Sequence, residues 1–275
     1  MSRSASQSIR TVPFLAAYAV AATATAADLR ISQVYGGGGS TSATATYNKD
    51  FVELFNAGST PINLAGYVLE YGSATGNWGS AAANYFTFPK GAVIQPCGYL
   101  LVASTTASTG GAALPVTPDH LFTINMSATN GKVAIFNALN ANLACGSEIA
   151  GTLVDKMAYG TANCAEGTAV VALSVTTGAV RNGDGLDDTD SNVADFAIVT
   201  APVPRNAASP TNPNCGGGGP PPCPADLNGD RDVGPQDLAV LLGNWGNSGI
   251  GDINGDGVVG AQDLAAMLGV WGLCP

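Results

Sequence analysis

Short apolar runs separated by turn residues fill the chain from about residue 28 to residue 206. They are LRISQVYG, DFVELFN, INLAGYVLEYG, YFTFP, GYLLVAS, GKVAIFNA and TLVDKMAYG. In DFVELFN the side chains alternate, with Phe51, Glu53 and Phe55 on one face and the residues between them on the other. Turn-forming stretches such as NAGSTP and FPKGA separate the runs. This pattern predicts a mainly β body, a sandwich of two sheets.

A second pattern, with helical spacing, occurs twice near the end of the chain. Apolar residues recur there at i, i+3, i+4 and i+7, which is one stripe of an α-helix. They are Leu238, Leu241, Leu242 and Trp245 in the first copy and Leu264, Met267, Leu268 and Trp271 in the second. Each copy therefore predicts an amphipathic helix whose stripe faces a small core. Gly246 and Gly272 are expected to end these helices.

Between the two patterns lies a segment that can supply no core. Residues 207–222 read AASPTNPNCGGGGPPP, in which glycine gives flexibility and proline gives stiffness. We therefore expect a linker between a body at 28–206 and a separate module at 223–275.

The first 26 residues have the pattern of a secretory signal peptide. Arg3 and Arg10 come before an apolar run, and the small residues ATA precede an expected cleavage after Ala26. The apolar run is too short to span a membrane. We expect the mature protein, 27–275, to be secreted and either extracellular or associated with a cell surface.

The charge balance argues against nucleic acid as a partner. The chain has 20 acidic and 10 basic residues, with a pI near 4.2, and it has no basic cluster that would neutralise phosphates. It also has one histidine, His120, in no recognisable catalytic motif. We interpret His120 as a core or surface residue, and the protein as no enzyme.

The two helical segments each follow an acidic loop, and the loops are copies of one another. DLNGDRDVGPQDLAVLLGNWG and DINGDGVVGAQDLAAMLGVWG begin at Asp226 and Asp252 and agree at 14 of 21 positions. The last 53 residues contain seven acids and one arginine. This excess of negative charge indicates a bound cation.

Oxygen ligands fall at positions 1, 3, 5 and 12 of each loop, and position 7 would contribute a backbone carbonyl. The candidates are Asp226, Asn228, Asp230, Asp232 and Asp237 in the first loop and Asp252, Asn254, Asp256, Val258 and Asp263 in the second. Oxygens at this spacing surround Ca²⁺ in EF-hand loops. Because no helix precedes either loop, we predict two half EF-hands that bind two Ca²⁺ ions. The alternative is two Asx-rich turns without an ion.

On these loops and helices, the module resembles a type I dockerin over its whole length. The resemblance implies a calcium-dependent plug that binds a cohesin-like domain on a scaffold or cell surface. It also implies recognition through loop positions 10 and 11, here Pro235, Gln236, Ala261 and Gln262. Those positions usually carry small hydroxyl residues in the family, and position 6 of the first loop is Arg231 where the second has Gly257.

The body resembles the lamin tail domain in its secreted bacterial form. The similarity runs from LRISQVYGGGG through DFVELFNAGSTPINLAGYVLEYGS, FPKGAVIQPCGYLLVAS and DKMAYGTANCAEG to VRNGDGLDDTDSNVADF and PRNAASP. It implies an immunoglobulin-like β-sandwich. Such modules usually accompany other exported proteins as accessory parts.

Six cysteines remain after the expected cleavage, an even number that suggests disulfides in an exported protein. Cys223 and Cys274 flank the module and are expected to join its ends. Within the body, spacing favours Cys145 with Cys164, which leaves Cys97 for Cys215.

Two features of the body invite a functional interpretation, and each has a plainer alternative. The turn RNGDGLDDTDSN holds Asp184, Asp187, Asp188 and Asp190, which suit either a third Ca²⁺ or a solvated, hydrogen-bonded turn. Tyr71, Trp78 and Tyr85 could form a sugar-stacking surface, although packing under a long loop is favoured.

These inferences describe a secreted, non-catalytic protein of two modules. A calcium-bound dockerin would tether a β-sandwich, which serves as a display or adhesion module, to a surface partner. The alternative is an extracellular enzyme or accessory module that acts on polysaccharide or nucleic acid, with calcium purely structural. Asp188 and Trp78 would be its test residues.

Overall fold

A computed structural model describes residues 28–215, 225–227, 232–254 and 256–273. Several predictions from the sequence fall outside these residues. They concern the signal peptide 1–26, part of the linker 207–222, the loop ligands Asn228 and Asp230, Arg231, and the Cys223–Cys274 pair.

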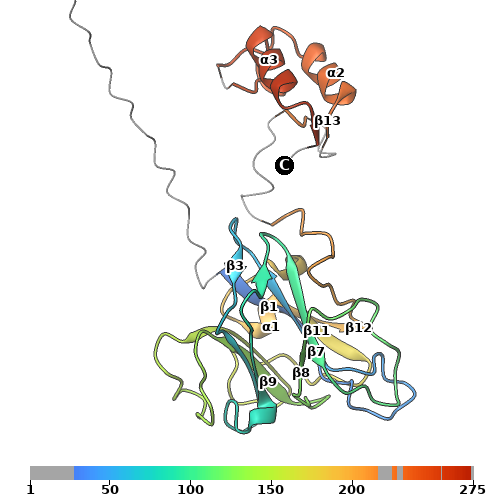
Figure 1. Cartoon of the computed structure of the whole chain (residues 1–275), viewed down its shortest axis with the longest axis vertical. Coiled ribbons are helices and arrows are strands. Elements are labelled where there is room, and N and C mark those ends of the chain that lie inside the picture. The colour runs from blue at the N-terminus through green and yellow to red at the C-terminus, as the bar shows by residue number, and fades with distance from the viewer. Residues whose placement is uncertain (1–27, 216–224, 228–231, 255, 274–275) are drawn as a thin grey trace, which may run out of the picture.

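The body is a sandwich of a six-stranded and a four-stranded sheet (Figure 1). The larger sheet has the order β12 (Phe196–Thr200), β11 (Thr177–Arg181), β1 (Leu29–Tyr35), β2 (Phe51–Asn56), β7 (Tyr99–Ser104) and β8 (His120–Phe122). The smaller has the order β10 (Leu153–Tyr159), β9 (Gly131–Phe136), β4 (Val68–Ser73) and β5 (Tyr85–Thr87). All neighbouring strands in the two sheets are antiparallel except β7 and β8.

Smaller elements complete the described part of the chain. In the body these are the strand pair β3 (Ile62–Asn63) and β6 (Val93–Ile94), the 3-10 helices η2 (Ala82–Asn84) and η3 (Gly183–Gly185), and α1 (Asn192–Asp195). The module contains β13 (Asp232–Val233), α2 (Pro235–Gly243), α3 (Ala261–Gly269) and β14 (Gly272–Leu273). The predicted mainly β fold is confirmed, and each of the seven apolar runs contains a strand.

Strand β2 is buried on both faces, because two separate layers cover it. Val52 and Leu54 point into the main core between the sheets. On the outer face, Phe51 packs with Tyr35 and Tyr47, and Phe55 packs beside Tyr99. The alternation in DFVELFN is therefore present, but neither of its faces meets solvent.

Residues 201–215, which follow β12, cover part of that outer face and are referred to below as the strap. Arg205 lies over the ring of Tyr99, 3.8 Å from its centroid, and its guanidinium is 2.9 Å from the buried carboxylate of Glu53. Glu53 of β2 is thus buried together with its counter-charge, Arg205, and it also accepts hydrogen bonds from the side chains of Ser32 and Gln33. A buried carboxylate without these partners would be costly.

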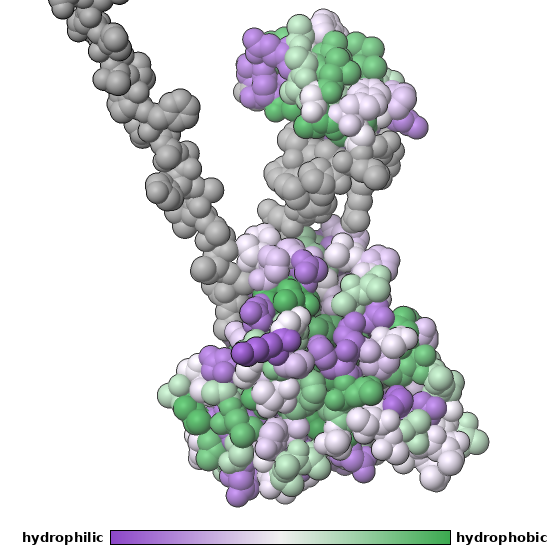
Figure 2. All heavy atoms as spheres, viewed as in Figure 1, coloured by the Kyte–Doolittle hydropathy of each residue, from purple (hydrophilic) through white to green (hydrophobic). Residues whose placement is uncertain are grey.

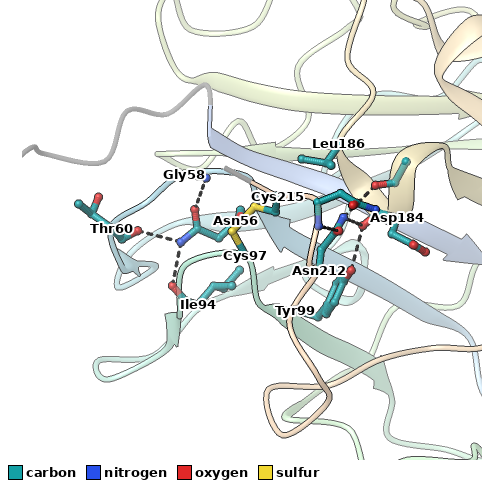
Figure 3. The surroundings of a disulfide bond; sticks show 12 residues. Asn56, Gly58, Thr60, Ile94, Cys97, Tyr99, Asp184, Leu186, Asn212 and Cys215 are labelled. Atoms are coloured by element: carbon teal, nitrogen blue, oxygen red, sulfur yellow. Dashed lines mark hydrogen bonds between the residues drawn. A yellow bond between two sulfur atoms is a disulfide. The ribbon is translucent and has the colours of Figure 1, made fainter. Parts of the chain in front are cut away.

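The strap ends at a disulfide that fastens it to the larger sheet (Figure 3). Cys215 is bonded to Cys97, in the turn before β7. Close to it, Asn212 donates a backbone hydrogen bond to the carbonyl of Cys97 (2.9 Å) and a side-chain hydrogen bond to the carbonyl of Gly183 (2.9 Å). The second disulfide joins Cys145 to Cys164. Both pairs are those that the sequence favoured.

A buried ion pair joins the two sheets on one side of the main core. Arg181 on β11 of the larger sheet is 1% exposed, and its guanidinium donates to the carboxylate of Asp155 on β10 of the smaller sheet (2.8 Å). The same carboxylate accepts the backbone N–H of Ile31 on β1 (2.6 Å), and Arg181 donates to the carbonyl of Ile31 (2.8 Å). One charged pair therefore fixes three strands in two layers.

Replacement of Asp155 with Asn should strongly destabilise the sandwich. The variant keeps the shape of the side chain but leaves Arg181 buried without its closest counter-charge, a change that costs about 3 kcal/mol or more. Urea unfolding of the full chain, followed by the circular dichroism of the strands, measures the loss. Asp187→Asn removes an exposed carboxylate from the neighbouring turn and should stay within about 0.5 kcal/mol of the parent. Equal midpoints for the two variants would contradict the role given to the pair.

Candidate metal centre

The C-terminal module has an internal two-fold repeat in its backbone pairing. Val233 in the first loop pairs with Gly272, which follows the second helix. Val259, the equivalent of Val233 in the second loop, exchanges hydrogen bonds with Gly246 and Asn247, which follow the first helix (2.9 and 2.8 Å). Each loop is therefore held by the segment that leaves the other copy's helix.

The two helices end earlier than the sequence suggested. α2 ends at Gly243 and α3 at Gly269, consistent with the low helix propensity of glycine. Gly246 and Gly272 lie beyond the helices at positive φ (79° and 109°), where they form the paired segments just described. The prediction that they end the helices directly is wrong, although glycine is needed at both positions for its left-handed backbone.

The predicted apolar stripes are only partly buried. Leu241 and Met267 form the core with Ala225, Val233 and Val259, and Leu238 and Leu264 pack beside them. Leu242, Trp245, Leu268 and Trp271 are instead 51%, 46%, 55% and 45% exposed. The tryptophans lie beyond the helix ends, so the helical period no longer places them on the core side. These four residues are called the apolar surface below. In Figure 2 hydrophobic residues are conspicuous on the visible face of the module.

The aspartate at position 12 closes each loop in the same way. Asp237 accepts the backbone N–H groups of Leu227 (2.7 Å) and Gly234 (2.8 Å). Asp263 accepts those of Ile253 (2.8 Å), Asn254 (3.0 Å) and Gly260 (2.7 Å). Both aspartates are fully buried. The bonds from Gly234 and Gly260 also cap the helices, because in each the aspartate at the third helical position accepts the N–H of the residue before the helix.

In the second loop the side chains of positions 1, 3 and 5 turn toward one short stretch of backbone. The carboxylate of Asp252 accepts the N–H groups of Asp256 (3.1 Å) and Gly257 (2.8 Å). The amide oxygen of Asn254 accepts the same N–H of Asp256 (2.9 Å). The carboxylate of Asp256 in turn accepts the backbone N–H of Val258 (3.0 Å). Gly257, at position 6, has a φ of +92°, as a sharp turn there requires.

This donor set suits a hard cation in kind, since every group at positions 1, 3, 5 and 12 carries a side-chain oxygen. The carboxylates of Asp252, Asp256 and Asp263 do not come within 4.8 Å of one another, however, whereas two other clusters of the described residues do. Each carboxylate is satisfied locally by backbone N–H groups. Hydrogen bonds from Asn254 and Gly260 lower the pKa of Asp263, so it stays ionised in the loop. An ion would draw these side chains closer together, and an oxygen that accepts an N–H group can still contact the ion, because a carboxylate or amide oxygen accepts more than one bond.

The residues expected to contact a partner begin the two helices and are exposed. Pro235 and Ala261 are the first residues of α2 and α3, and Gln236 and Gln262 follow them. Gln262 accepts a hydrogen bond from the side chain of Asn254 (2.8 Å), which links it to the loop. The apolar surface was not expected from the sequence, because its residues were assigned to the core.

The acidic turn of the body is organised around arginines. Asp188 is 3.1 Å from Arg30 and 3.1 Å from Arg181, and Asp184 is 3.0 Å from Arg205. Guanidinium groups thus supply positive charge where a third calcium was considered. The turn matches the plainer interpretation, a hydrogen-bonded surface turn.

One of the two close clusters lies under this turn and consists of Asp155, Glu166 and Asp188. Glu166 is half-buried and accepts a side-chain hydrogen bond from Asn192 (3.3 Å). Burial raises the pKa of Glu166 from its ordinary 4.5 to about 8, and the negative charge of Asp155 adds to the shift. The other cluster is Glu148 with the two sulfurs of the Cys145–Cys164 disulfide, which cannot bind a metal as thiolates.

The aromatic residues considered for sugar stacking belong mainly to the interior. Trp78 is fully buried beside Phe136 and donates its indole N–H to Glu148 (2.7 Å), and Tyr71 is 6% exposed. Tyr85 is half-buried on β5. A stacking surface made of these residues is therefore wrong, and the packing interpretation is confirmed. His120 packs against the rings of Phe86 and Phe88, 5.9 and 6.0 Å away.

The longest helices among the described residues have nine residues, and none could cross a membrane. A sequence profile described as Lamin Tail Domain matches residues 22–161, half of the chain. No curated protein matches. Among solved structures, the crystal structure of a DUF4876 family protein from Bacteroides thetaiotaomicron aligns with 69% of this chain and 75% of its own, at 11% identity and a TM-score of 0.41.

Glu166→Gln should make the sandwich less sensitive to pH. The pKa of Glu166 is higher in the folded than in the unfolded protein, so the folded parent is most stable at low pH, where Glu166 is protonated in both states. The parent then loses stability as pH rises from about 5 through about 8, because the unfolded state ionises first. After solvent screening we expect a relative gain for the variant on the order of 1 kcal/mol at pH 9 and little difference at pH 5. Thermal unfolding of both proteins across this range measures it. A constant difference at every pH would contradict the assignment.

Proposed function

Since the chain belongs to the lamin tail domain family, we propose that its β-sandwich is a displayed module that the C-terminal module tethers outside the cell. The tether would be a calcium-dependent dockerin that binds a cohesin-like domain. The sandwich would take part in display or adhesion and would not catalyse a reaction. The two disulfides of the body are compatible with an extracellular location.

The observation that carries this proposal is the duplication of an oxygen-rich loop followed by a helix. The copies share sequence, and the described residues share their position-12 closure and their backbone pairing. A module this small has little core, since five of its described residues form the buried part of its main cluster. Two ions that neutralise the loops would supply stability that the core does not.

The surface of the module favours a protein partner. Pro235 and Gln236 on one helix, and Ala261 and Gln262 on the other, are exposed at equivalent positions. The apolar surface adds two leucines and two tryptophans, again in equivalent pairs. Large apolar side chains exposed in this number on so small a module favour an interaction site, and tryptophan is enriched in the centres of interfaces. The near-equivalence of the halves would allow two binding orientations.

Calorimetry on the full chain should show two Ca²⁺ ions bound. Asp252→Asn with Asp256→Asn removes two charges from the second loop and should leave one ion bound, because the first loop keeps its ligands. At a free concentration of about 100 Kd, one site adds about 2.7 kcal/mol to module stability. Asp187→Asn with Asp190→Asn removes the same charge from the acidic turn of the body and should leave two ions. Absence of Ca²⁺ binding in the parent would show that the ion assignment is wrong.

The partner is tested with recombinant cohesin domains encoded by the producing organism, immobilised and exposed to the full chain. We expect capture in calcium and release by chelator. Trp245→Ala with Trp271→Ala should abolish capture while two Ca²⁺ ions still bind, and Val171→Ala with Val203→Ala, two exposed apolar residues of the body, should have no effect. Calcium binding without capture by any cohesin would leave the ions as a folding clamp and reject the tether.

A further inference from the structure

A cavity of about 510 Å³ opens at one end of the sandwich, away from the residues discussed so far. It is formed where four strands of the larger sheet begin or end. Gly38 and Gly39 follow β1, Asp50 precedes β2, segment 104–109 follows β7, and segment 123–125 follows β8. Loops gathered at the end of an immunoglobulin-like sandwich are a common place for binding sites.

The floor of the cavity is held by a buried carboxylate. Asp50 is 1% exposed and accepts the backbone N–H groups of Gly38 (2.8 Å) and Met126 (2.8 Å) through its two oxygens. The backbone carbonyl of Asp50 accepts the N–H of Ser104, and its backbone N–H donates to the hydroxyl of Ser104. Burial raises the pKa of Asp50 to about 6, so the group is an anionic acceptor at neutral pH. Because each carboxylate oxygen can accept further bonds, the floor can also receive a ligand hydroxyl.

Glycine is required at position 38, in the part of the lining that adjoins Asp50. A Cβ at Gly38 would lie 1.8 Å from the backbone carbon of Lys49, and one at Gly39 would lie 2.9 Å from the side-chain oxygen of Asn125. The 105–109 loop is fixed by backbone bonds from Thr105 to Phe122 and from Ser108 to Asn48, both 2.8 Å. The cavity therefore has a built frame on each side.

The chemistry of the lining selects one kind of ligand. Seven of the thirteen lining residues carry a hydroxyl group, most of them on segment 104–109, and they are joined by the amide of Asn125 and the carboxylate of Asp50, although the larger part of the accessible lining is apolar. Among the residues that line the cavity, none is basic and none is aromatic. An anion would meet no basic side chain in the lining, since the ammonium of Lys49 donates to the carbonyls of Ser104 and Thr105. A hydrocarbon would find one large apolar side chain, Ile124. A metal ion would meet a single carboxylate whose oxygens already accept N–H groups.

We propose that this cavity binds a neutral sugar residue. One of its hydroxyls donates to the carboxylate of Asp50, and the others donate to and accept from the surrounding Thr, Ser and Asn side chains. The volume falls in the range of small-molecule sites. The proposal is independent of the function proposed for the C-terminal module, since every lining residue belongs to the sandwich.

Saturation-transfer NMR on the full chain tests it. The probes are neutral hexoses, pentoses and N-acetylhexosamines. Their disaccharides are tested as well, to distinguish a site for a free sugar from a site for the end of a longer chain. A sulfated disaccharide and CaCl₂ alone are the competing ligands. We expect transfer to at least one neutral sugar, equally in calcium and in chelator, and none to the sulfated probe.

Two variants with matched controls assign the binding to the cavity. Ala107→Trp fills the cavity from an exposed loop position and should abolish transfer, whereas Ala65→Trp, at an exposed turn residue elsewhere, should not. Thr123→Val removes one lining hydroxyl and should weaken binding about 3- to 10-fold, with Thr87→Val on β5 as its control. Absence of transfer from every neutral sugar, equal transfer in Ala107→Trp and the parent, or preference for the sulfated probe or calcium would overturn the proposal.

Discussion

The ion pair between Arg181 and Asp155 is the interaction on which the sandwich most depends. It links strands of both sheets, and it also holds β1, which lies between β11 and β2. A buried charge pair gains little over an apolar pair of the same shape, but removing one partner is very costly. Arg181 also donates to the backbone and side chains of the acidic turn. The acidic turn, which was considered for a third Ca²⁺, is therefore part of the framework between the sheets.

Most of the strands could be predicted from apolar runs, because each of these runs pairs with neighbours that bury its apolar side. The rest of the larger sheet could not. Strand β11 carries few apolar residues, and β12, although mostly apolar, lies at the edge of the sheet. β11 pairs with β1 and β12 pairs with β11, an arrangement that depends on Arg181 and on pairing between distant segments of the chain. The double burial of β2 was also hidden, since part of the layer over its outer face comes from the strap, about 150 residues later.

In the module, the repeated ligand pattern and the existence of both helices follow from the sequence alone. Their ends do not, since Gly243 and Gly269 stop the helices one turn before the apolar spacing does. This difference moves Trp245 and Trp271 from the expected core to the surface. The cavity at the end of the sandwich was equally out of reach. Its lining residues come from four segments that are distant in the sequence, and only the folding of the larger sheet brings these segments together.

The Cys97–Cys215 disulfide acquires a mechanical meaning if the C-terminal module is an anchor. A pull on that end of the chain reaches the sandwich at Cys215 and passes through the sulfurs to Cys97, in the turn before β7. The covalent path then leaves out the whole segment between the two cysteines, from β7 through the strap. Tension is borne at one turn, close to strand β2, and β11 and β12 are shielded from peeling away from the sheet edge. The disulfide would thus keep the edge strands β11 and β12 paired when flow pulls on the anchored protein.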